Sequence, residues 1–351
     1  MKLALQLAAK AKGMTSPNPA VGAVIVKRNK IIGTGYHMKA GADHAEIIAL
    51  QKAGTKAKDA TLYVTLEPCS HWGKTPPCTD AILAAGVGEV VVGVKDPNRK
   101  VDGITILRQH GVKVKVGILE EECKKLNEEH TKFMRSNMPL VTLKAAISLD
   151  GKIATTTGSS RYITGNEART FVHKQRTMID AVMIGINTAL KDDPFLNPRL
   201  AKGKDPYKVV VDSKLKILPT LNLVKHNPEK LIIATTSKAS KAKIKMLEEK
   251  GAKVLIIVSK KGRVDLKALM KTLAKQDITS IIIEGGATLN TEAIKEGIVD
   301  KVMFFINPSI IGSGISSLGD LGIKDVNKKI VLKDVSYRKL GKDIMVEGRL
   351  K

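Results

Sequence analysis

The chain has 351 residues, of which 43% are hydrophobic and 26% are charged. This balance is typical of a globular protein and excludes a disordered chain, and the length favours two domains over one. The formal net charge of +25 indicates an anionic partner. Because the chain has only five tyrosines, five phenylalanines and one tryptophan, stacking on nucleic-acid bases is disfavoured, and we expect a phosphorylated small molecule instead.

The amino-terminal segment and the cysteines bear on location. Residues 1–10 superficially resemble a signal peptide, but their apolar run is short, is interrupted by Gln6 and carries Leu3 and Leu7 as a helical stripe. No stretch approaches about 18 uninterrupted apolar residues, so we expect no membrane partner. Three cysteines cannot build a disulfide framework, and thiolate metal ligands need a reducing compartment, so we expect a cytoplasmic protein. Cys123 follows three glutamates, and we expect it to be a bystander on a helix, its thiol pKa raised by those carboxylates.

The first half alternates predicted strands and helices. Strands are expected over 20–26 and 30–37, around a tight turn at Arg28 and Asn29, and then over 61–66, 90–94 and 112–116. Helices are expected over 44–54 and 79–85. These elements predict a layered α/β domain, which we assign to residues 1–138.

A histidine, a glutamate and two cysteines stand out in this half. His44 and Glu46 open the predicted helix 44–54, while Cys69 and Cys78 flank a loop. A catalytic zinc takes three nitrogen or sulfur ligands and leaves a fourth position for a water, whose pKa it lowers toward ~7. We therefore predict that His44, Cys69 and Cys78 bind zinc. Glu46 is then the general base within reach of the water, which is the pattern of zinc deaminases.

The spacing of the two cysteines is unusual, because the second comes nine residues after the first instead of three. Residues 70–77 must loop out, and Gly73 with the proline pair after it suits such a loop. We expect His71 and Lys74 to face the cleft. The alternative is a structural zinc with His71 as the fourth ligand, which would leave Glu46 without a role.

The second half opens with a predicted strand in 140–151 that leads into a polar turn. Residues 280–289 indicate a buried strand that stops at Gly285 and Gly286 and restarts as a helix. Backbone N–H groups at such a helix start approach phosphates in many proteins. Close packing of strand and helix is the competing explanation for the glycine pair.

Several motifs in both halves carry a family resemblance. They are Pro17-Asn18-Pro19-Ala20-Val21-Gly22, His44-Ala45-Glu46, Glu67-Pro68-Cys69-Ser70-His71, Gly73-Lys74-Thr75-Pro76-Pro77-Cys78, Lys144, Ser148-Leu149-Asp150-Gly151, Gly158-Ser159-Ser160-Arg161-Tyr162-Ile163-Thr164 and Asp192-Asp193-Pro194. Together they resemble the bifunctional riboflavin-biosynthesis deaminase/reductase family over nearly the whole chain. The resemblance implies an α/β fold with a cytidine-deaminase-like three-layer domain over 1–138 and a dihydrofolate-reductase-like domain over 139–351.

The resemblance implies two consecutive steps of riboflavin biosynthesis on one chain. The first domain would remove the 2-amino group of 2,5-diamino-6-ribosylamino-4(3H)-pyrimidinone 5′-phosphate by attack of zinc hydroxide on the ring carbon. Glu46 would take the proton of the water and deliver protons to the ring nitrogen and the departing ammonia. The second domain would reduce the ribosyl group of the product to a ribityl chain with hydride from NADPH.

Positions that match the family's motifs are implied as site residues. In the first domain, Asn18, His37 and Lys74 would contact the substrate. In the second, the residues around NADPH would be Ala146, Tyr162, Thr164, Thr188, Asp192, Gly286, Ala287, Thr288 and Leu289. Those around the ribosyl phosphate would be Ser160, Arg176, Leu196, Arg199 and Glu284. Lys144 and Asp192 would polarise and protonate the opening sugar.

Alternatives stay open at this point. Surface ion pairing competes as the role of Arg176 and Arg199 in so basic a chain. A deaminase that edits nucleic acid would use the same zinc site, but it should expose aromatic residues along a groove. A second half that serves only as a scaffold is the third alternative, which a hydride-transfer assay with NADPH separates. The oligomeric state, a homo-oligomer included, also stays open.

Overall fold

In the computed structural model, which describes residues 1–73 and 76–350, the chain divides into two units, Met1–Asn137 and Met138–Lys351. The elements of the first unit are α1 (Lys2–Ala9), β1 (Gly22–Lys27), β2 (Lys30–Tyr36), α2 (Ala45–Ala53), a short 3-10 turn (Gly54–Ala57), β3 (Thr61–Leu66), α3 (Cys78–Ala84), β4 (Glu89–Val94), α4 (Gly103–Gln109), β5 (Lys113–Val116), α5 (Glu120–Leu126) and α6 (Glu128–Ser136). Every strand and helix predicted for this half is present, with bounds shifted by one or two residues at most.

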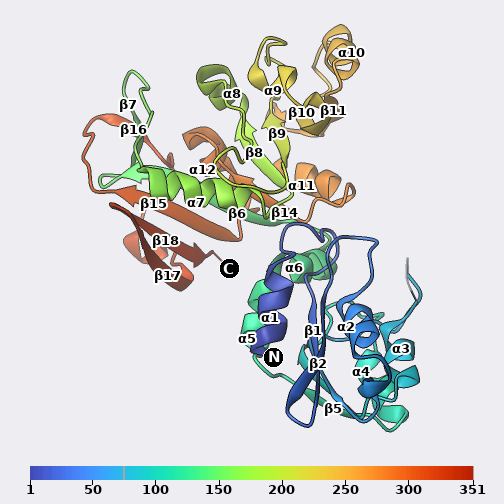
Figure 1. Ribbon diagram of the computed structural model, residues 1–351. Coiled ribbons are helices and arrows are strands. Elements are labelled where there is room, and N and C mark those ends of the chain that lie inside the picture. Colours follow the sequence, from blue (N-terminus) through green and yellow to red (C-terminus); the bar gives the residue numbers. More distant parts are fainter. Residues whose placement is uncertain (74–75, 351) are drawn as a thin grey trace. The chain divides into compact units, whose positions relative to one another are not determined.

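The first unit has three layers. Its described strands form one sheet in the order β2-β1-β3-β4-β5, in which β1 pairs antiparallel with β2 and β3, and the last three strands run parallel. Helices α1 and α5 lie on one side of the sheet and α2, α3 and α4 on the other (Figure 1). The tight turn between β1 and β2 has positive φ angles of 49° at Arg28 and 60° at Asn29, as the short hairpin requires.

The second unit has more elements. They are β6 (Leu140–Ser148), β7 (Lys152–Thr155), α7 (Asn166–Arg176), β8 (Ala181–Gly185), α8 (Ile186–Asp192), β9 (Tyr207–Val211), α9 (Asn222–Lys225), β10 (Leu231–Thr235), α10 (Lys241–Glu249), β11 (Lys253–Ile256), β12 (Ser259–Lys260), β13 (Arg263–Val264), α11 (Leu266–Ala274), β14 (Ser280–Ile283), α12 (Ala287–Lys295), β15 (Lys301–Asn307), β16 (Gly314–Ser316), β17 (Lys333–Leu340) and β18 (Asp343–Arg349), besides 3-10 turns at Pro228–Lys230 and Val326–Lys328. The predicted strand after residue 140 and the strand, glycine pair and helix around 280–294 are confirmed.

The large sheet of the second unit has the order β11-β10-β9-β8-β14-β6-β15-β18-β17 within the described residues. The strands from β11 to β15 run parallel, and β18 and β17 add an antiparallel edge. Parallel strands covered on both faces have apolar residues at successive positions. In β8, Met183 packs in a core with α11 and α12, while the next residue, Ile184, packs in a second core with α8 and α10. Helix α7 covers the sheet near β15 and β18 through Val172 (Figure 1).

Among the described residues, no helix is both long and apolar enough to cross a membrane. The cysteine outside the metal pattern behaves as a core residue. Cys123 is fully buried in α5. Burial raises its thiol pKa to about 11 and the nearby Glu122 carboxylate adds to this, so the predicted direction holds although burial is the larger cause.

Candidate active sites

Three potential zinc ligands meet at one point of the first unit. His44 is the residue before α2, Cys69 lies in the loop after β3, and Cys78 is the first residue of α3. His44 Nδ1 lies 3.2 Å from Cys78 Sγ and 3.5 Å from Cys69 Sγ. The backbone N–H of Cys78 donates a hydrogen bond of 3.3 Å to Cys69 Sγ.

This donor set fits zinc. A tetrahedral zinc with bonds of about 2.1 Å to nitrogen and about 2.3 Å to sulfur holds such ligands about 3.6 Å apart. The three ligand atoms lie within 4.8 Å of one another, and over residues 1–73 and 76–350 the group has these three members without His71. A site with three protein ligands has an open coordination position, so the alternative of a closed structural site is not supported.

Glu46 lies beside this group on the first turn of α2. Its side chain is buried, and burial raises the pKa of its carboxyl to about 7. A hydrogen bond with the Cys78 side chain acts in the opposite direction and joins Glu46 to the ligand group. A buried carboxyl with a pKa near neutrality both accepts and releases a proton readily, which is what a general acid and base must do.

Helix α2 is held close to the sheet by two glycines in β2. A Cβ at Gly33 would overlap the carbonyl oxygen of Ala49, and one at Gly35 would overlap that of Ala45. Glycine at both positions therefore lets the backbone of α2 lie against β2, which fixes the helix start where His44 and Glu46 stand.

His37 lies beside the metal group, and Asn18 contacts His37. Asn18 Nδ2 lies 3.2 Å from His37 Nε2, and His37 Nδ1 lies 3.0 Å from the carbonyl oxygen of Asp43. Because a carbonyl only accepts, Nδ1 carries the hydrogen and Nε2 accepts from Asn18. The His37 ring is buried and packs edge-on against His44, with centroids 5.3 Å apart. The predicted substrate contact Lys74 lies outside the described residues.

The sequence reasoning missed two carboxylates at this site. Glu67, just after β3, accepts the backbone N–H groups of Asp96 (3.1 Å) and Ile104 (3.0 Å), and so holds the segment after β4 against the cysteine loop. Burial is the main cause that raises the pKa of Asp96, which also interacts electrostatically with Cys69. Glu67 and Asp96 follow two strands predicted from sequence, 61–66 and 90–94, which pair parallel, so their carboxyl ends lie at one edge of the sheet.

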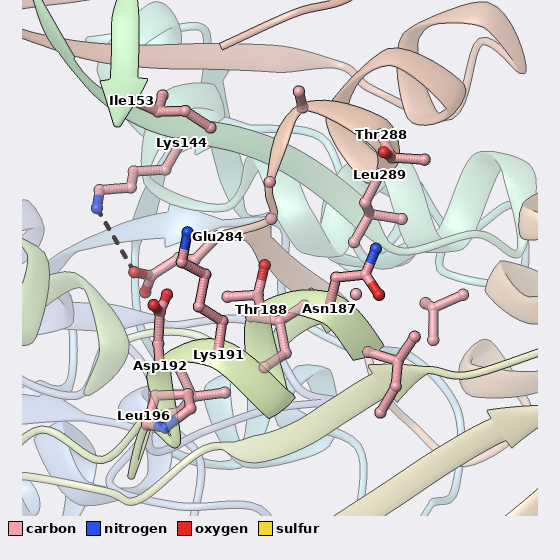
Figure 2. A pocket seen from close by; sticks show the side chains of 18 of the residues that line it. Lys144, Ile153, Asn187, Thr188, Lys191, Asp192, Leu196, Glu284, Thr288 and Leu289 are labelled. Atoms are coloured by element: carbon pink, nitrogen blue, oxygen red, sulfur yellow. Dashed lines mark ion pairs between the residues drawn. The ribbon is translucent and has the colours of Figure 1, made fainter. Parts of the chain in front are cut away.

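The second unit contains a cavity of 2210 Å³ at the carboxyl edge of its sheet. Each site residue predicted for this half lines it: Lys144, Ala146, Ser160, Tyr162, Thr164, Arg176, Thr188, Asp192, Leu196, Arg199, Glu284, Gly286, Ala287, Thr288 and Leu289. Figure 2 shows Lys144, Asp192 and Glu284 directed into this cavity from β6, α8 and the end of β14.

A largely buried carboxylate with two cations lines the cavity. Arg176 Nε and Nη2 donate to the two oxygens of Glu284 at 2.7 Å and 2.9 Å, and Lys144 Nζ lies 3.5 Å from Glu284 Oε2 (Figure 2). Burial would raise the pKa of Glu284, but the charges of Arg176 and Lys144 outweigh it and lower this pKa to about 2. The Arg176 fork thus binds Glu284 in this structure, and the two side chains are largely buried, with exposed fractions of 11% and 9%.

The loop after α8 is fixed at both ends. Asn222 donates from its backbone N–H and its side chain to the Asp193 carboxylate at 2.7 Å and 2.9 Å, and Arg176 Nη1 donates to the carbonyl of Asn197 at 3.1 Å. Leu196, between these anchors, has a positive φ of 55° and a buried side chain. The predicted substrate contacts Leu196 and Arg199 therefore stand on a preformed loop.

His173 and Tyr162 also line the cavity. Sequence reasoning missed His173, a buried α7 residue, whose pKa is lowered to about 4 by burial and by the positive charges of Arg176 and Arg199. It lies one turn before Arg176 on the same helix, which the helical repeat could have revealed. Tyr162 is exposed, and the Arg169 guanidinium lies over its ring at 3.8 Å.

The start of α12 fits the diphosphate of a dinucleotide. Gly286 precedes the helix, and the first intrahelical bond there runs from the Asn290 N–H to the Gly286 carbonyl. The N–H groups of Ala287, Thr288 and Leu289 belong to the first turn, in which helices leave donors without intrahelical partners. These groups and the helix dipole favour a bound phosphate inside the cavity.

Comparison with known proteins identifies the family. Residues 139–346 match the RibD C-terminal domain, and residues 1–94 match the cytidine and deoxycytidylate deaminase zinc-binding region. The riboflavin biosynthesis protein RibD of Aquifex aeolicus (strain VF5) is 46% identical over 349 residues, which are 99% of this chain and 96% of that relative. That of Escherichia coli (strain K12) is 38% identical, over 98% of this chain and 96% of the relative. The chain belongs to the RibD family.

Solved RibD structures share the whole fold. The structure of RibD from Acinetobacter baumannii has a TM-score of 0.90 at 36% identity and covers 99% of this chain and 97% of its own. A structure from Thermotoga maritima, with a TM-score of 0.88 at 36% identity and the same coverage, is named diaminohydroxyphosphoribosylaminopyrimidine deaminase/5-amino-6-(5-phosphoribosylamino)uracil reductase. RibD proteins thus join a zinc-binding deaminase to an NADPH-dependent reductase, and the fold class inferred from sequence is confirmed.

Proposed function

We propose that the chain catalyses two consecutive steps of riboflavin biosynthesis, with a zinc-dependent deaminase in residues 1–138 and an NADPH-dependent reductase in residues 139–351. Its substrate is 2,5-diamino-6-ribosylamino-4(3H)-pyrimidinone 5′-phosphate. The observation that carries the first activity is a buried carboxyl, Glu46, beside the three-ligand group of His44, Cys69 and Cys78. The phosphorylated substrate also agrees with the excess of positive charge on the chain.

In the first step, water replaces the 2-amino group of the pyrimidine ring and ammonia leaves. Zinc, when bound by the three ligands, supplies Lewis acidity toward that water. Glu46 accepts a proton from the water and delivers protons to the ring nitrogen and to the leaving amine, so one carboxyl serves the reaction twice. Its elevated pKa suits both directions of transfer. Asn18 and His37 adjoin the ligand group and orient the ring, and Lys74 is assigned to the substrate phosphate.

In the second step, a hydride adds to C1′ of the ribosyl group, the bond from C1′ to the ring oxygen breaks, and that oxygen takes a proton. NADPH supplies the hydride when bound. Lys144 and Asp192, which both line the cavity, polarise and protonate the opening sugar. Glu284 holds Lys144 at 3.5 Å and Arg176 in a forked pair, so these side chains are positioned before the substrate arrives.

The remaining predicted residues divide between cofactor and substrate. The start of α12, Thr188, Thr164, Tyr162 and Ala146 are assigned to NADPH. Ser160, Leu196 and Arg199, together with the Arg176 and Glu284 pair, are assigned to the ribosyl phosphate. The guanidinium of Arg176 has three N–H groups that the Glu284 fork does not use, and one of them donates to the carbonyl of Asn197. Its part in phosphate binding is therefore smaller than that of an unpaired arginine.

The test is an assay of purified protein on the diaminopyrimidinone substrate in which ammonia release and NADPH oxidation are followed separately. We expect both, with ammonia released first. Asp192→Asn and Lys144→Ala should each lower the rate of NADPH oxidation by about 100-fold or more and leave ammonia release unchanged. Ammonia release without NADPH oxidation would reduce the second unit to a scaffold. Reductase rates within a few-fold of wild type in either variant would refute the roles of Lys144 and Asp192.

A further inference from the structure

The order of strands defines a direction along the large cavity. Among the described strands, β6, β14, β8, β9 and β10 follow one another in the sheet and run parallel, so their carboxyl ends form one edge. Lys144 lies on β6, and α12 begins after β14. Neighbouring strands are about 4.8 Å apart, so the end of β10 lies about 14 Å beyond that of β14. The cavity continues along this edge as far as the hairpin of β12 and β13.

The far end of the cavity carries lysines without partners. Lys214 comes three residues after β9, Lys238 three residues after β10, and Lys261 stands in the turn between β12 and β13. All three side chains are exposed and line the cavity. Within residues 1–73 and 76–350, none of the three has an ion pair or a side-chain hydrogen bond. We call these three residues the lysine cluster.

The segments that bear the lysine cluster are tied together at Ser213. Its hydroxyl oxygen accepts the Val264 N–H of the hairpin at 3.0 Å, and its carbonyl accepts the Thr236 hydroxyl at 2.8 Å. Ser213 thus connects the segment after β9 to the loop after β10 and to the hairpin of β12 and β13. These bonds hold together the three segments from which the lysine cluster extends.

Each carboxylate that lines this end of the cavity is either paired with a cation or buried. Glu296 lies 3.8 Å from Lys260, and Glu292 lies 3.7 Å from Arg263. Asp212 is fully buried, and its Oδ2 accepts the Ile217 N–H at 2.7 Å. Positive charge therefore exceeds negative charge at this end of the cavity, which suits an anion that carries more than one charge.

We propose that the lysine cluster binds the 2′-phosphate of NADPH and selects NADPH over NADH. This inference rests on the proposed reductase function. With the nicotinamide beside Lys144 and the diphosphate at the start of α12, the adenosine half extends over the ends of β9 and β10. The 2′-phosphate is the only group that distinguishes the two cofactors, and a phosphate monoester carries a charge of about −1.5 to −2 near neutral pH. Lysine ammonium groups are compact charges on flexible side chains, so several of them can reach one phosphate group.

The test compares two nucleotides that contain only the adenosine half. Calorimetry measures the binding of adenosine 2′,5′-bisphosphate and of 5′-AMP to wild type and to the triple variant Lys214→Gln/Lys238→Gln/Lys261→Gln. We expect the triple variant to bind the bisphosphate about 30-fold more weakly and 5′-AMP within about threefold of wild type. Lys245→Gln is the matched control, because Lys245 is an exposed lysine of α10 that does not line the cavity, and it should bind both nucleotides as wild type does.

Steady-state kinetics on the deaminated substrate provide the second measurement. The triple variant should show a KM for NADPH raised by the same factor, with kcat and the KM for NADH unchanged. Unchanged bisphosphate affinity, or an equal loss for 5′-AMP, would overturn the inference while NADPH oxidation by wild type still upheld the reductase. Failure of wild type to oxidise either cofactor would refute the proposed reductase function and, with it, this inference.

Discussion

The two units assemble their candidate sites in different ways. In the first unit the ligand atoms of His44, Cys69 and Cys78 lie within 4.8 Å of one another, and the residues come from a stretch of 35 positions. In the second unit the candidate residues come from Lys144 to Leu289 and line a cavity of 2210 Å³. The first arrangement gathers soft donors around a single ion, whereas the second spreads separate polar groups along a surface long enough for a dinucleotide and a sugar phosphate.

This difference shows which side chains each unit must hold in place before the substrate binds. A metal site holds its ligands by the bonds to the ion, and the buried Glu46 alone has to be kept in place by packing. The part of the second unit that the structure describes has no such ligand group, and the network of Arg176, Glu284 and Lys144 holds the side chains of its cavity in place. Removing one side chain from the site should therefore lower only the activity in the first unit, but lower both activity and stability in the second.

The largest expected effect follows from removal of the metal. Incubation with a strong zinc chelator should abolish ammonia release, because three protein ligands alone do not activate water. NADPH oxidation on the pre-deaminated substrate should be unaffected, because the second unit has no such ligand group among its described residues. Added Zn²⁺ should restore ammonia release. Loss of both activities on chelation would remove the contrast between the units.

Glu46→Gln should lower the rate of ammonia release by about 1000-fold, because general acid and base catalysis typically contributes 10²–10⁴-fold. The amide keeps the shape of the side chain and cannot exchange the proton. Zinc content, measured by atomic absorption on the purified variant, should equal that of wild type. A variant that lost its zinc as well would show that Glu46 supports the ligand group, and its rate would then say nothing about proton transfer.

Glu284→Ala should destabilise the second unit by about 3 kcal/mol, because it leaves the largely buried Arg176 without its carboxylate partner. Urea unfolding that resolves the two units measures this free energy. The stability of the first unit should be unchanged. Glu249→Ala is the control, because that carboxylate belongs to an exposed pair with Lys245 and should have little effect. Equal stability of Glu284→Ala and wild type would exclude a structural role for the network.

The same network predicts a pH dependence. The folded pKa of Glu284, about 2, lies below the ordinary value of 4.5, so the ionised carboxylate contributes stability that is fully present above about pH 4.5. That contribution is lost as the pH falls through 4.5 toward 2. The difference in unfolding free energy between wild type and Glu284→Gln should therefore be constant from pH 7 to about pH 5 and shrink below it. A difference that grew on acidification would contradict the sign of the pKa shift.

A smaller effect is expected at the hydrogen bond between Asn18 and His37. Asn18→Ala should remove a neutral hydrogen bond, worth about 0.5–1.5 kcal/mol, and lower kcat/KM of deamination by about tenfold. Asn127→Ala is not a suitable control, because its buried side chain bonds the backbone of Ala20. Asn98→Ala, whose side chain bonds the exposed Lys100 N–H, should leave the rate unchanged.

How much could be predicted from sequence differs between the two sites. The candidate metal ligands could be chosen from sequence because metal chemistry restricts both residue type and spacing, and their flanking strand and helices have clear patterns. In the second half the residues came from the family resemblance, and all of them line the cavity. The pairing of Arg176 with Glu284, 108 positions apart, could not be predicted because it depends on the packing of α7 against the end of β14. The bonds of Glu67 to the backbone N–H groups of Asp96 and Ile104 could not be predicted residue by residue, because they depend on how the segment after β4 folds against the cysteine loop.

The most direct test of the central claim, two independent sites in two units, is a crossed assay of Glu46→Gln and Lys144→Met. Each variant is measured for ammonia release on the diaminopyrimidinone substrate and for NADPH oxidation on its deaminated product. The account predicts that Glu46→Gln loses the first activity and keeps the second, and that Lys144→Met does the reverse. Loss of both activities in either folded variant would contradict it.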